Sequence, residues 1–481
     1  MIVMLTKALL ATALSAEAFR QLQATGYYPQ RGYVGILLTP YFGLLAATSV
    51  ICGVLYACGQ GASLHIAIYV AAAFISVAVK RKTPLKFTKR IGRMMTVCFA
   101  LNFVLVCLRL PVAILLPMVA IASWCVCLPV DQKIARHYLA KASQKLRSCG
   151  ATVIAVTGSY GKTSVKSMLC SLLDGAVCAE GSCNTPLGIA TFLNKTDLTD
   201  VKYVVLEFGA RKMNDITELC DLYKPFCGVV TGVCEQHLKT FGSLDNIIRT
   251  KQELLCNLPH DGFCVLNSAD ETVRGWIGIG NCQKILSQSN VRVERKLTSL
   301  LGAELSVDGV YDVKLPQICG YVADTFAMCA EVCLRLGQPI GKTVANAVKV
   351  RAAPHRAECM HNGRFFIVDD SYNASIQGIR SICVTLSEVK KTKVAITQGI
   401  VECGVKSKQL NVECGELLGK TFDVVVVTGK NKRYLLEGLS RTQCKTLVAR
   451  SLSDATNVAV KHVDADGVLY FQNDLPDTVG L

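Results

Sequence analysis

Acidic residues are almost absent from the first 149 residues of this 481-residue chain. That region contains 16 lysines and arginines but only two acids, Glu17 and Asp131, whereas residues 150–481 carry 36 basic and 34 acidic side chains. The excess positive charge therefore lies beside apolar N-terminal runs, a distribution typical of cytoplasmic loops in membrane proteins. A nucleic-acid partner is not indicated, because no basic stripe crosses the remainder of the chain.

Charge of either sign is scarce throughout. Charged residues make up 18% of the chain and hydrophobic residues 51%, which excludes an intrinsically disordered protein. Paired CxxC motifs, internal repeats and low-complexity tracts are also missing, and the 24 cysteines are scattered singly. Neither a structural zinc site nor a disulfide framework is indicated, so we expect reduced, buried cysteines in a protein facing the cytosol.

Residues 1–130 are predicted to form a membrane-spanning region of four or five apolar segments. Ile36–Cys58 and Ala62–Val79 are uncharged runs long enough to cross a bilayer. Met94–Val130 is interpreted as a further hairpin with Arg109 near its turn. Its first arm has only 15 residues, so a re-entrant or interfacial segment is the alternative.

The basic residues orient this region. Seven of them and no acid lie between Lys80 and Arg93, and the segment Asp131–Arg147 is basic again. Both segments should face the cytoplasm, which predicts a multi-pass protein of the cell membrane, in contact with lipids, with its later domains in the cytoplasm. Residues 1–18 could be a fifth span or an interfacial helix, and they lack a clear signal-peptide cleavage site.

From residue 151, short β-branched runs alternate with helix-like stretches, which predicts parallel α/β sheets. A first series of strands is expected at Thr152–Thr157, Tyr203–Glu207, Gly228–Gly232 and Phe263–Leu266, with a small β-rich excursion in residues 280–320. A second series is expected at Phe365–Asp369, Lys393–Thr397, Asp423–Thr428, Thr446–Ala449 and Val468–Phe471. We expect domains at 131–350 and 351–481, because Ala-Ala-Pro breaks a helix within Arg351–Arg356.

A phosphate-binding turn follows the first expected strand. It has the order strand, glycine turn, Lys-Thr and helix start, although Val156 stands where the strict P-loop pattern has its first glycine. Backbone N–H groups of such a turn bind phosphate oxygens, Lys162 would reach the β- and γ-phosphates, and the Thr163 hydroxyl would bind Mg²⁺. The residues expected to bind nucleotide here are Thr157, Gly158, Ser159, Gly161, Lys162, Thr163 and Ser164.

Five stretches in order along residues 150–440 resemble the Mur ligase family, which forms amide bonds in peptidoglycan precursors. They are Thr157-Gly158-x-x-Gly161-Lys162-Thr163, Asn184-Thr185-Pro186-Leu187-Gly188, Glu207-x-Gly209, His237-Leu238-x-x-Phe241-Gly242-Ser243 with Lys251-x-Glu253, and Asp369-Asp370-Ser371-Tyr372-Asn373-Ala374. The last stretch is most similar to the members that add D-alanyl-D-alanine. The resemblance implies a P-loop central domain, a Rossmann-like C-terminal domain, and a ligase that uses ATP and Mg²⁺ to activate a carboxylate as an acyl phosphate.

The resemblance also implies roles for single residues. Lys162, Lys251 and His237 would be catalytic, with Lys251 carbamoylated. Thr163, Glu207, His237 and Lys251 would hold Mg²⁺. Asn267 would contact the adenine, and the C-terminal domain would bring Arg356 to the phosphates, Asp369 to the ribose, and Asn373 to the ATP.

Two departures from the family pattern leave the substrates open: the first concerns contacts to the incoming amine, and the second concerns the acceptor. Gly399, Glu402 and Gly404 are in place, but the aspartate of the family's G-D-M-x-E-L-G segment is missing. Apolar segments also occupy the place of the usual UDP-sugar-binding domain. The acceptor could therefore be a muropeptide or a lipid-linked precursor, with D-alanyl-D-alanine as the expected amine.

Three alternatives remain. A folate polyglutamate ligase shares the loop but not the DDSYNA stretch or the apolar segments. A Mur-like lipid II amidotransferase subunit would be expected to carry a four-cysteine zinc ribbon, which is not visible. A membrane scaffold that only binds nucleotide would not need the full set of Lys162, Thr163, Glu207, His237 and Lys251.

Overall fold

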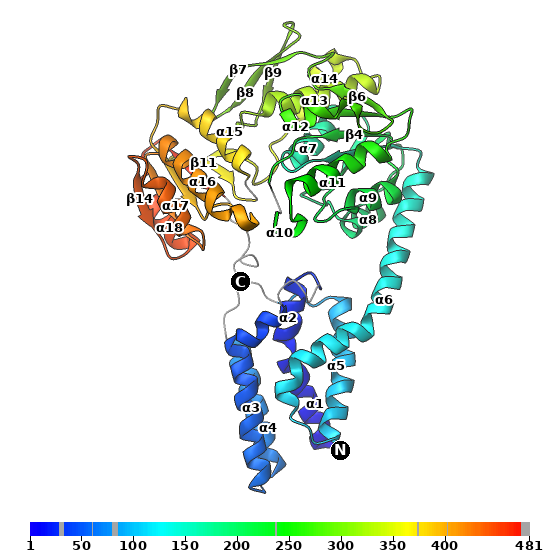
Figure 1. The fold of residues 1–481 in the computed structure, drawn as a ribbon, viewed down its shortest axis with the longest axis vertical. Helices are drawn as coiled ribbons and strands as arrows, with labels where there is room; N and C mark the ends of the chain where they lie inside the picture. Colours follow the sequence, from blue (N-terminus) through cyan, green and yellow to red (C-terminus); the bar gives the residue numbers. More distant parts are fainter. Residues whose placement is uncertain are drawn as a thin grey trace. The chain divides into compact units, whose positions relative to one another are not determined.

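The computed structural model describes residues 1–27, 33–59, 61–78, 85–235, 238–372, 375–401 and 403–472 (Figure 1). It separates into two compact units, which divide between His137 and Tyr138. The predicted residues His237, Asn373 and Glu402 lie outside the described residues.

The N-terminal unit consists of helices. Their bounds are α1 Ile2–Leu14, α2 Ala16–Ala24, η2 Tyr33–Leu38, α3 Pro40–Ala57, α4 Ala62–Ala78, α5 Lys89–Cys107 and α6 Val112–Ser148. By length and composition, four segments of the described chain could cross a membrane: Ile2–Ala24, Pro40–Ala57, Lys89–Cys107 and Val112–Ser148. A fifth segment, expected at Ala62–Val79, is helical from Ala62 to Ala78, but its apolar helix Ser63–Ser76 is shorter than these four.

The hairpin around Arg109 is present, but its arms are longer than expected. Helix α5 ends at Cys107, α6 begins at Val112, and Arg109 between them has a φ of 59°. The first arm begins at Lys89 rather than Met94, so the 15-residue estimate was wrong. Within this unit, Asp131 pairs with Arg90 Nε at 2.6 Å and with Arg93, so the acid on α6 offsets part of the positive charge at the start of α5.

The first sheet of the second unit contains six parallel strands in the order β2-β3-β1-β4-β5-β6. Their bounds are β1 Thr152–Thr157, β2 Ala176–Cys178, β3 Tyr203–Glu207, β4 Cys227–Val230, β5 Phe263–Leu266 and β6 Gln283–Leu286. Strands β1, β3 and β5 have the predicted bounds, whereas β4 lies one to two residues earlier than predicted. The β-rich excursion is an antiparallel sheet of β7 Val293–Ser299, β8 Gly302–Val307 and β9 Tyr311–Leu315.

The second sheet has the order β10-β11-β15-β12-β13-β14, and only the β10–β11 pair is antiparallel. Its strands are β10 Glu358–His361, β11 Phe366–Asp370, β12 Lys393–Thr397, β13 Val424–Val427, β14 Lys445–Val448 and β15 Val468–Gln472. All five predicted strands of this series are present within one residue at each end. The parallel α/β class predicted from residue 151 onward is therefore confirmed.

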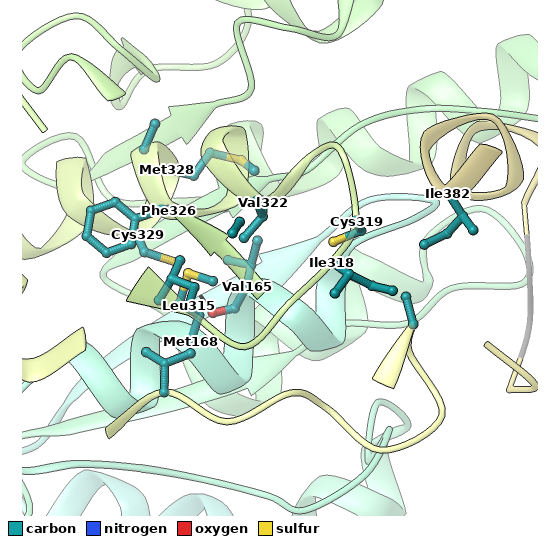
Figure 2. Packing of buried hydrophobic residues seen from close by; sticks show 14 of the residues in the cluster. Val165, Met168, Leu315, Ile318, Cys319, Val322, Phe326, Met328, Cys329 and Ile382 are labelled. Atoms are coloured by element: carbon teal, nitrogen blue, oxygen red, sulfur yellow. Dashed lines mark hydrogen bonds between the residues drawn. The ribbon is translucent and has the colours of Figure 1, made fainter. Parts of the chain in front are cut away.

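Helices cover both sheets. The longer ones are α7 Lys162–Leu172, α8 Pro186–Lys195, α9 Asp215–Tyr223, α11 Leu244–Asn257, α13 Val322–Arg335, α15 Ile376–Ser387, α16 Ser407–Thr421, α17 Lys432–Leu439 and α18 Leu452–Ala459. The short ones are α10 Leu238–Phe241, α12 Glu271–Arg274, η3 Gly275–Gly278, α14 Ile340–Asn346, η4 Ala347–Lys349 and η5 Gly404–Lys406. One apolar cluster extends from the first sheet to the second, while separate clusters lie beneath α8 and α9 and beneath α18. Figure 2 shows Val165 of α7 near Val322 of α13, with Ile318 and Cys319 between these helices and Ile382 of α15.

Candidate active site

The predicted residues gather at the carboxyl edge of the first sheet. Thr157 ends β1, Glu207 ends β3, and Asn267 follows β5 directly. Carboxyl ends of parallel strands meet at one edge, and β1 has β3 on one side and β4 on the other. In parallel α/β sheets, ligands bind at this kind of switch point.

The glycine turn has a conformation that few residues other than glycine tolerate. Gly158 has a φ of 143°, and a Cβ there would lie 2.1 Å from Thr231 Oγ1. Gly161 has a φ of 72° and is the N-cap residue of helix α7. The Ser159 N–H donates to Gly232 O at 2.8 Å, which ties the turn to the segment after β4. This tight turn before a helix N-terminus is the geometry that binds phosphate.

Lys162 lies over the same turn. Its Nζ donates to the carbonyl oxygens of Gly158 at 2.7 Å and Ser159 at 3.2 Å. Burial lowers the pKa of Lys162, the positive charge of Arg356 lowers it further, and the negative charge of Glu207 opposes both effects. A polyphosphate bound at the turn would place negative charge beside this ammonium and favour its protonated form.

Glu207 is the centre of a buried polar cluster. Its side chain is 2% exposed, Thr163 Oγ1 donates to its Oε2 at 2.9 Å, and Asn184 Nδ2 donates to its Oε1 at 3.2 Å. A carboxylate and a hydroxyl are hard oxygen donors of the kind that Mg²⁺ prefers, so this pair fits the predicted ion. Among the described residues, no group of three or more His, Cys, Asp or Glu side chains is arranged to hold a metal ion.

Lys166 also contacts this cluster, which the sequence interpretation missed. Its Nζ is 3.8 Å from Glu207 Oε2, and its side chain is as buried as that of Glu207. The available signal was its spacing, because Lys166 follows Thr163 by three residues on one helix and therefore lies on the same face.

Lys251 is also buried, on α11 behind this edge of the sheet. It is 3% exposed, and burial, followed by the positive charge of Lys162, lowers its pKa to about 7. A lysine with such a pKa is largely an uncharged amine at slightly alkaline pH. The role of Lys251 as a modified metal ligand stays a prediction, because the neighbouring ligand His237 lies outside the described residues.

Asn267 and its neighbourhood tie β4 and β5 to the phosphate turn. Asn267 Nδ2 donates to Thr231 O at 2.8 Å, and its Oδ1 accepts from Ala269 N at 3.1 Å. Asp270, which the sequence interpretation missed, accepts hydrogen bonds from Tyr160 OH at 2.8 Å and Val233 N at 2.9 Å. Sequence patterns could not reveal the contact of Tyr160 with Asp270, because 110 residues separate the two. The adenine contact of Asn267 stays a prediction.

The turn before β10 contributes an arginine to the same site. The Arg356 guanidinium lies 4.3 Å from the centre of the Tyr372 ring, and its charge acts on Lys162. The Tyr372 hydroxyl is hydrogen-bonded to Ser182 Oγ, in the loop after β2. The structure therefore brings Arg356 towards the phosphate turn.

Asp369 and Asp370 have different environments. Asp369 Oδ2 accepts from His355 Nδ1 at 2.7 Å. Burial raises the pKa of Asp370 to about 7, against the positive charge of Arg356 and a hydrogen bond from Tyr470 OH at 3.1 Å. The contact of Asp369 with ribose remains a prediction.

A glycine turn at the switch point of a parallel sheet, with Lys162, Thr163 and a buried Glu207, is the arrangement typical of P-loop nucleotide-binding proteins. Comparison with known families refines this class, since residues 156–298 match the Mur ligase middle domain. The chain is 27% identical over 302 residues to the UDP-N-acetylmuramoyl-tripeptide–D-alanyl-D-alanine ligase of Escherichia coli, covering 59% of this chain. It is 34% identical over 256 residues to the enzyme of that name from Mycobacterium bovis, covering 48% of this chain.

A solved structure agrees with these similarities. The MurF ligase of Thermotoga maritima, determined in complex with ADP, has a TM-score of 0.60 and 25% identity, and the match covers 70% of this chain and 80% of that one. The match of residues 156–298 to the Mur ligase middle domain confirms the predicted resemblance to this family. The matched region spans 66% of the E. coli relative and 48% of the M. bovis relative.

Proposed function

We propose that this chain is an ATP-dependent ligase that joins a carboxylate of a peptidoglycan precursor to the amine of D-alanyl-D-alanine. The observation that carries the proposal is the contact of Thr163 with Glu207 beside Lys162 at the phosphate turn. The curated relatives named for this reaction support it over residues shared with this chain. The folate-ligase and scaffold alternatives gain no comparable support.

The reaction would proceed in two steps. An oxygen of the acceptor carboxylate attacks the γ-phosphorus of ATP, the bond to the leaving ADP breaks, and an acyl phosphate forms. The amine nitrogen then attacks the acyl carbon, phosphate leaves, and the amine loses a proton. Both transition states concentrate negative charge on oxygen, so positioned cations should supply most of the stabilisation.

Lys162 would supply one of these cations. With nucleotide bound, its ammonium would exchange the carbonyl oxygens of Gly158 and Ser159 for phosphate oxygens. Arg356 would add a second positive charge from the turn before β10, and Tyr372 supports its guanidinium. Asp369, Asn373 and Asn267 would bind the nucleoside end of ATP.

Thr163 and Glu207 would hold Mg²⁺, with His237 and Lys251 as the further proposed ligands. When bound, Mg²⁺ neutralises charge on the phosphate oxygens. The uncharged Lys251 amine can attack carbon dioxide: an N–C bond forms, a proton leaves, and a carbamate results. Its pKa of about 7 favours this, because a protonated lysine has no free electron pair for the attack.

We further propose that the helical unit anchors the ligase to the cell membrane, with residues 131–350 and 351–481 as its cytoplasmic domains. The four apolar segments and the basic residues around them support this arrangement. A membrane anchor would bring the site close to acceptors made at the inner membrane face. The acceptor would then be either a nucleotide-linked muropeptide or a lipid-linked one.

A product assay tests the function directly. The full-length protein in detergent or lipid is incubated with ATP, Mg²⁺, D-alanyl-D-alanine and either a UDP-N-acetylmuramoyl-tripeptide or its lipid-linked form. We expect ADP release that depends on the acceptor, and a product whose mass equals acceptor plus dipeptide minus water. ADP release without either acceptor, or product formation with a folate instead, would contradict the proposal.

A further inference from the structure

We infer that Lys166 is a positioning residue for the proposed metal site, fixing Glu207 and the loop of residues 179–185. This inference rests on the proposed function. Lys166 lies on α7, and its side chain is 1% exposed. Burying an ammonium group costs free energy unless the group is paired. The partners of the Lys166 ammonium therefore indicate which groups it positions.

The Lys166 ammonium has two described partners. It donates a hydrogen bond to the backbone carbonyl of Gly181, and it lies 3.8 Å from Glu207 Oε2. The second distance is that of an ion pair rather than a hydrogen bond. Lys166 therefore joins three parts of the site: the phosphate-turn helix α7, the loop after β2, and the end of β3.

The loop that Lys166 binds returns to Glu207. Asn184, three residues after Gly181, donates through Nδ2 to Glu207 Oε1. The backbone carbonyl of Asn184 also accepts from Gly209 N at 2.9 Å, and a Cβ on Gly209 would lie 2.7 Å from the Asn184 side chain. Lys166 thus attracts Glu207 Oε2 directly by its positive charge. It also supports the hydrogen bond to Glu207 Oε1, because it binds the loop that carries Asn184.

The same loop reaches the C-terminal sheet. Ser182 lies between Gly181 and Asn184 and is hydrogen-bonded to Tyr372, whose ring supports Arg356. Without the Lys166 ammonium, the Gly181 carbonyl would lose its hydrogen bond from a side chain, and Glu207 would lose its cationic neighbour. We expect Glu207 to lose its fixed orientation, while the phosphate turn itself, which is held by Thr231 and Gly232, stays intact.

The test measures nucleotide binding without turnover. A fluorescent ATP analogue is titrated into the full-length protein, with no acceptor present, once in EDTA and once in Mg²⁺. In Lys166→Met we expect the gain in affinity caused by Mg²⁺ to fall about tenfold, because groups that orient metal ligands typically contribute 10–100-fold in metal affinity. Affinity in EDTA should stay within about twofold of wild type, since the phosphate turn is unchanged.

Lys284→Met is the matched control. Lys284 lies on β6 of the same sheet and, like Lys166, donates to backbone carbonyls, those of Gly280 and Cys282, both at 2.7 Å. It should keep the full Mg²⁺ effect. Lys166→Arg, which retains the charge, should recover part of it, whereas a purely structural role would lower binding equally in EDTA and in Mg²⁺.

A double variant keeps the inference testable if Lys166→Met leaves Glu207 buried without its cation and does not fold. Glu207→Gln with Lys166→Met removes both charges, and we expect it to show the same Mg²⁺ effect as Glu207→Gln alone. A further loss in the double variant, or an undiminished Mg²⁺ effect in Lys166→Met, would overturn the inference. If wild type itself shows no Mg²⁺-dependent nucleotide binding, the proposed function fails instead.

Discussion

Thr163 Oγ1 donates a hydrogen bond of 2.9 Å to Glu207 Oε2, and so joins the first turn of α7 to the end of β3. The two residues are 44 positions apart, on neighbouring parallel strands and their connections. Both are oxygen donors, and both lie beside the lysine of the phosphate turn. This relationship makes a metal-dependent phosphoryl transfer chemically reasonable at this edge of the sheet.

Lys162→Ala should abolish ADP release that depends on the acceptor. The ammonium is the positioned cation nearest the phosphate turn, so its loss should lower the rate on the order of 10²-fold or more. Lys212→Ala is a suitable control, because Lys212 is exposed in the loop after β3. Turnover near that of wild type in Lys162→Ala would rule out the proposed role of the turn.

Glu207→Gln should raise the Mg²⁺ concentration needed for half-maximal activity, on the order of tenfold or more, because the amide keeps the size of the side chain but removes its charge. Glu218→Gln provides the control, since Glu218 is an exposed acid on α9. The measurement is initial rate against Mg²⁺ concentration at saturating ATP. An unchanged Mg²⁺ dependence would exclude Glu207 as a ligand.

Lys251→Met should stabilise the ligand-free protein at acidic pH. The pKa of Lys251 is lowered from about 10.5 in the unfolded chain to about 7 in the folded chain, so the unfolded chain binds more protons between these values. Stability of the wild type therefore rises with pH through this window, and below pH 7 the folded state carries the whole cost of a buried ammonium. Methionine removes that cost.

Thermal unfolding of the two proteins in carbon dioxide-free buffer tests this sign. The difference in Tm should be largest at pH 6 and should shrink steadily as the pH approaches 10. A Lys251→Met protein that is less stable than wild type at pH 6 would contradict the lowered pKa.

Carbamate formation is checked separately: protein supplied with ¹³C-bicarbonate should give a carbamate carbon signal in NMR that Lys251→Ala lacks. That variant should be inactive and partly rescued by short carboxylic acids.

The parts of the fold that follow from local sequence were predictable. Strands β1, β3 and β5 are buried β-branched runs, and their bounds agree with the prediction. Strands β2, β6 and β10 were not predicted as members of the two parallel series, because they are short and only partly buried and so carry little apolar pattern. Helix α5 was predicted too short because the charges of Arg90 and Arg93 suggested a loop, although both arginines pair with Asp131 on α6.

The site was predictable where a residue lies in a compact motif. Lys162, Thr163 and Glu207 meet as expected, because two strand ends and a helix start fix them. The partners of these residues were not predictable in the same way. Asp270 reaches Tyr160, and Lys166 reaches Gly181, only through the packing of loops that follow different strands. Such contacts depend on tertiary structure, and no spacing rule encodes them.

The last prediction concerns the helix that leads into the two α/β sheets. Residues 138–148 of α6 belong to the second unit, where Ala142 and Leu146 are buried and Ser143 Oγ donates to Leu222 O at 2.8 Å. A chain of residues 131–481 keeps these contacts and should fold and bind ATP. A chain of residues 150–481 loses them and should be less stable, since removing two buried apolar side chains costs about 2–5 kcal/mol.

Activity should separate these chains from the anchored protein. With ATP and Mg²⁺, the chain of residues 131–481 should turn over much more slowly than the full-length protein in lipid when the acceptor is lipid-linked, because the anchor no longer concentrates the two on one surface. Labelling of single cysteines placed in residues 131–147 of the full-length protein should occur from the cytoplasmic side, as the basic residues of this segment predict. Labelling from the outside would contradict the proposed orientation, because ATP is supplied in the cytosol. Equal rates for the truncated and full-length proteins on both kinds of acceptor would show that the helices do not deliver the substrate.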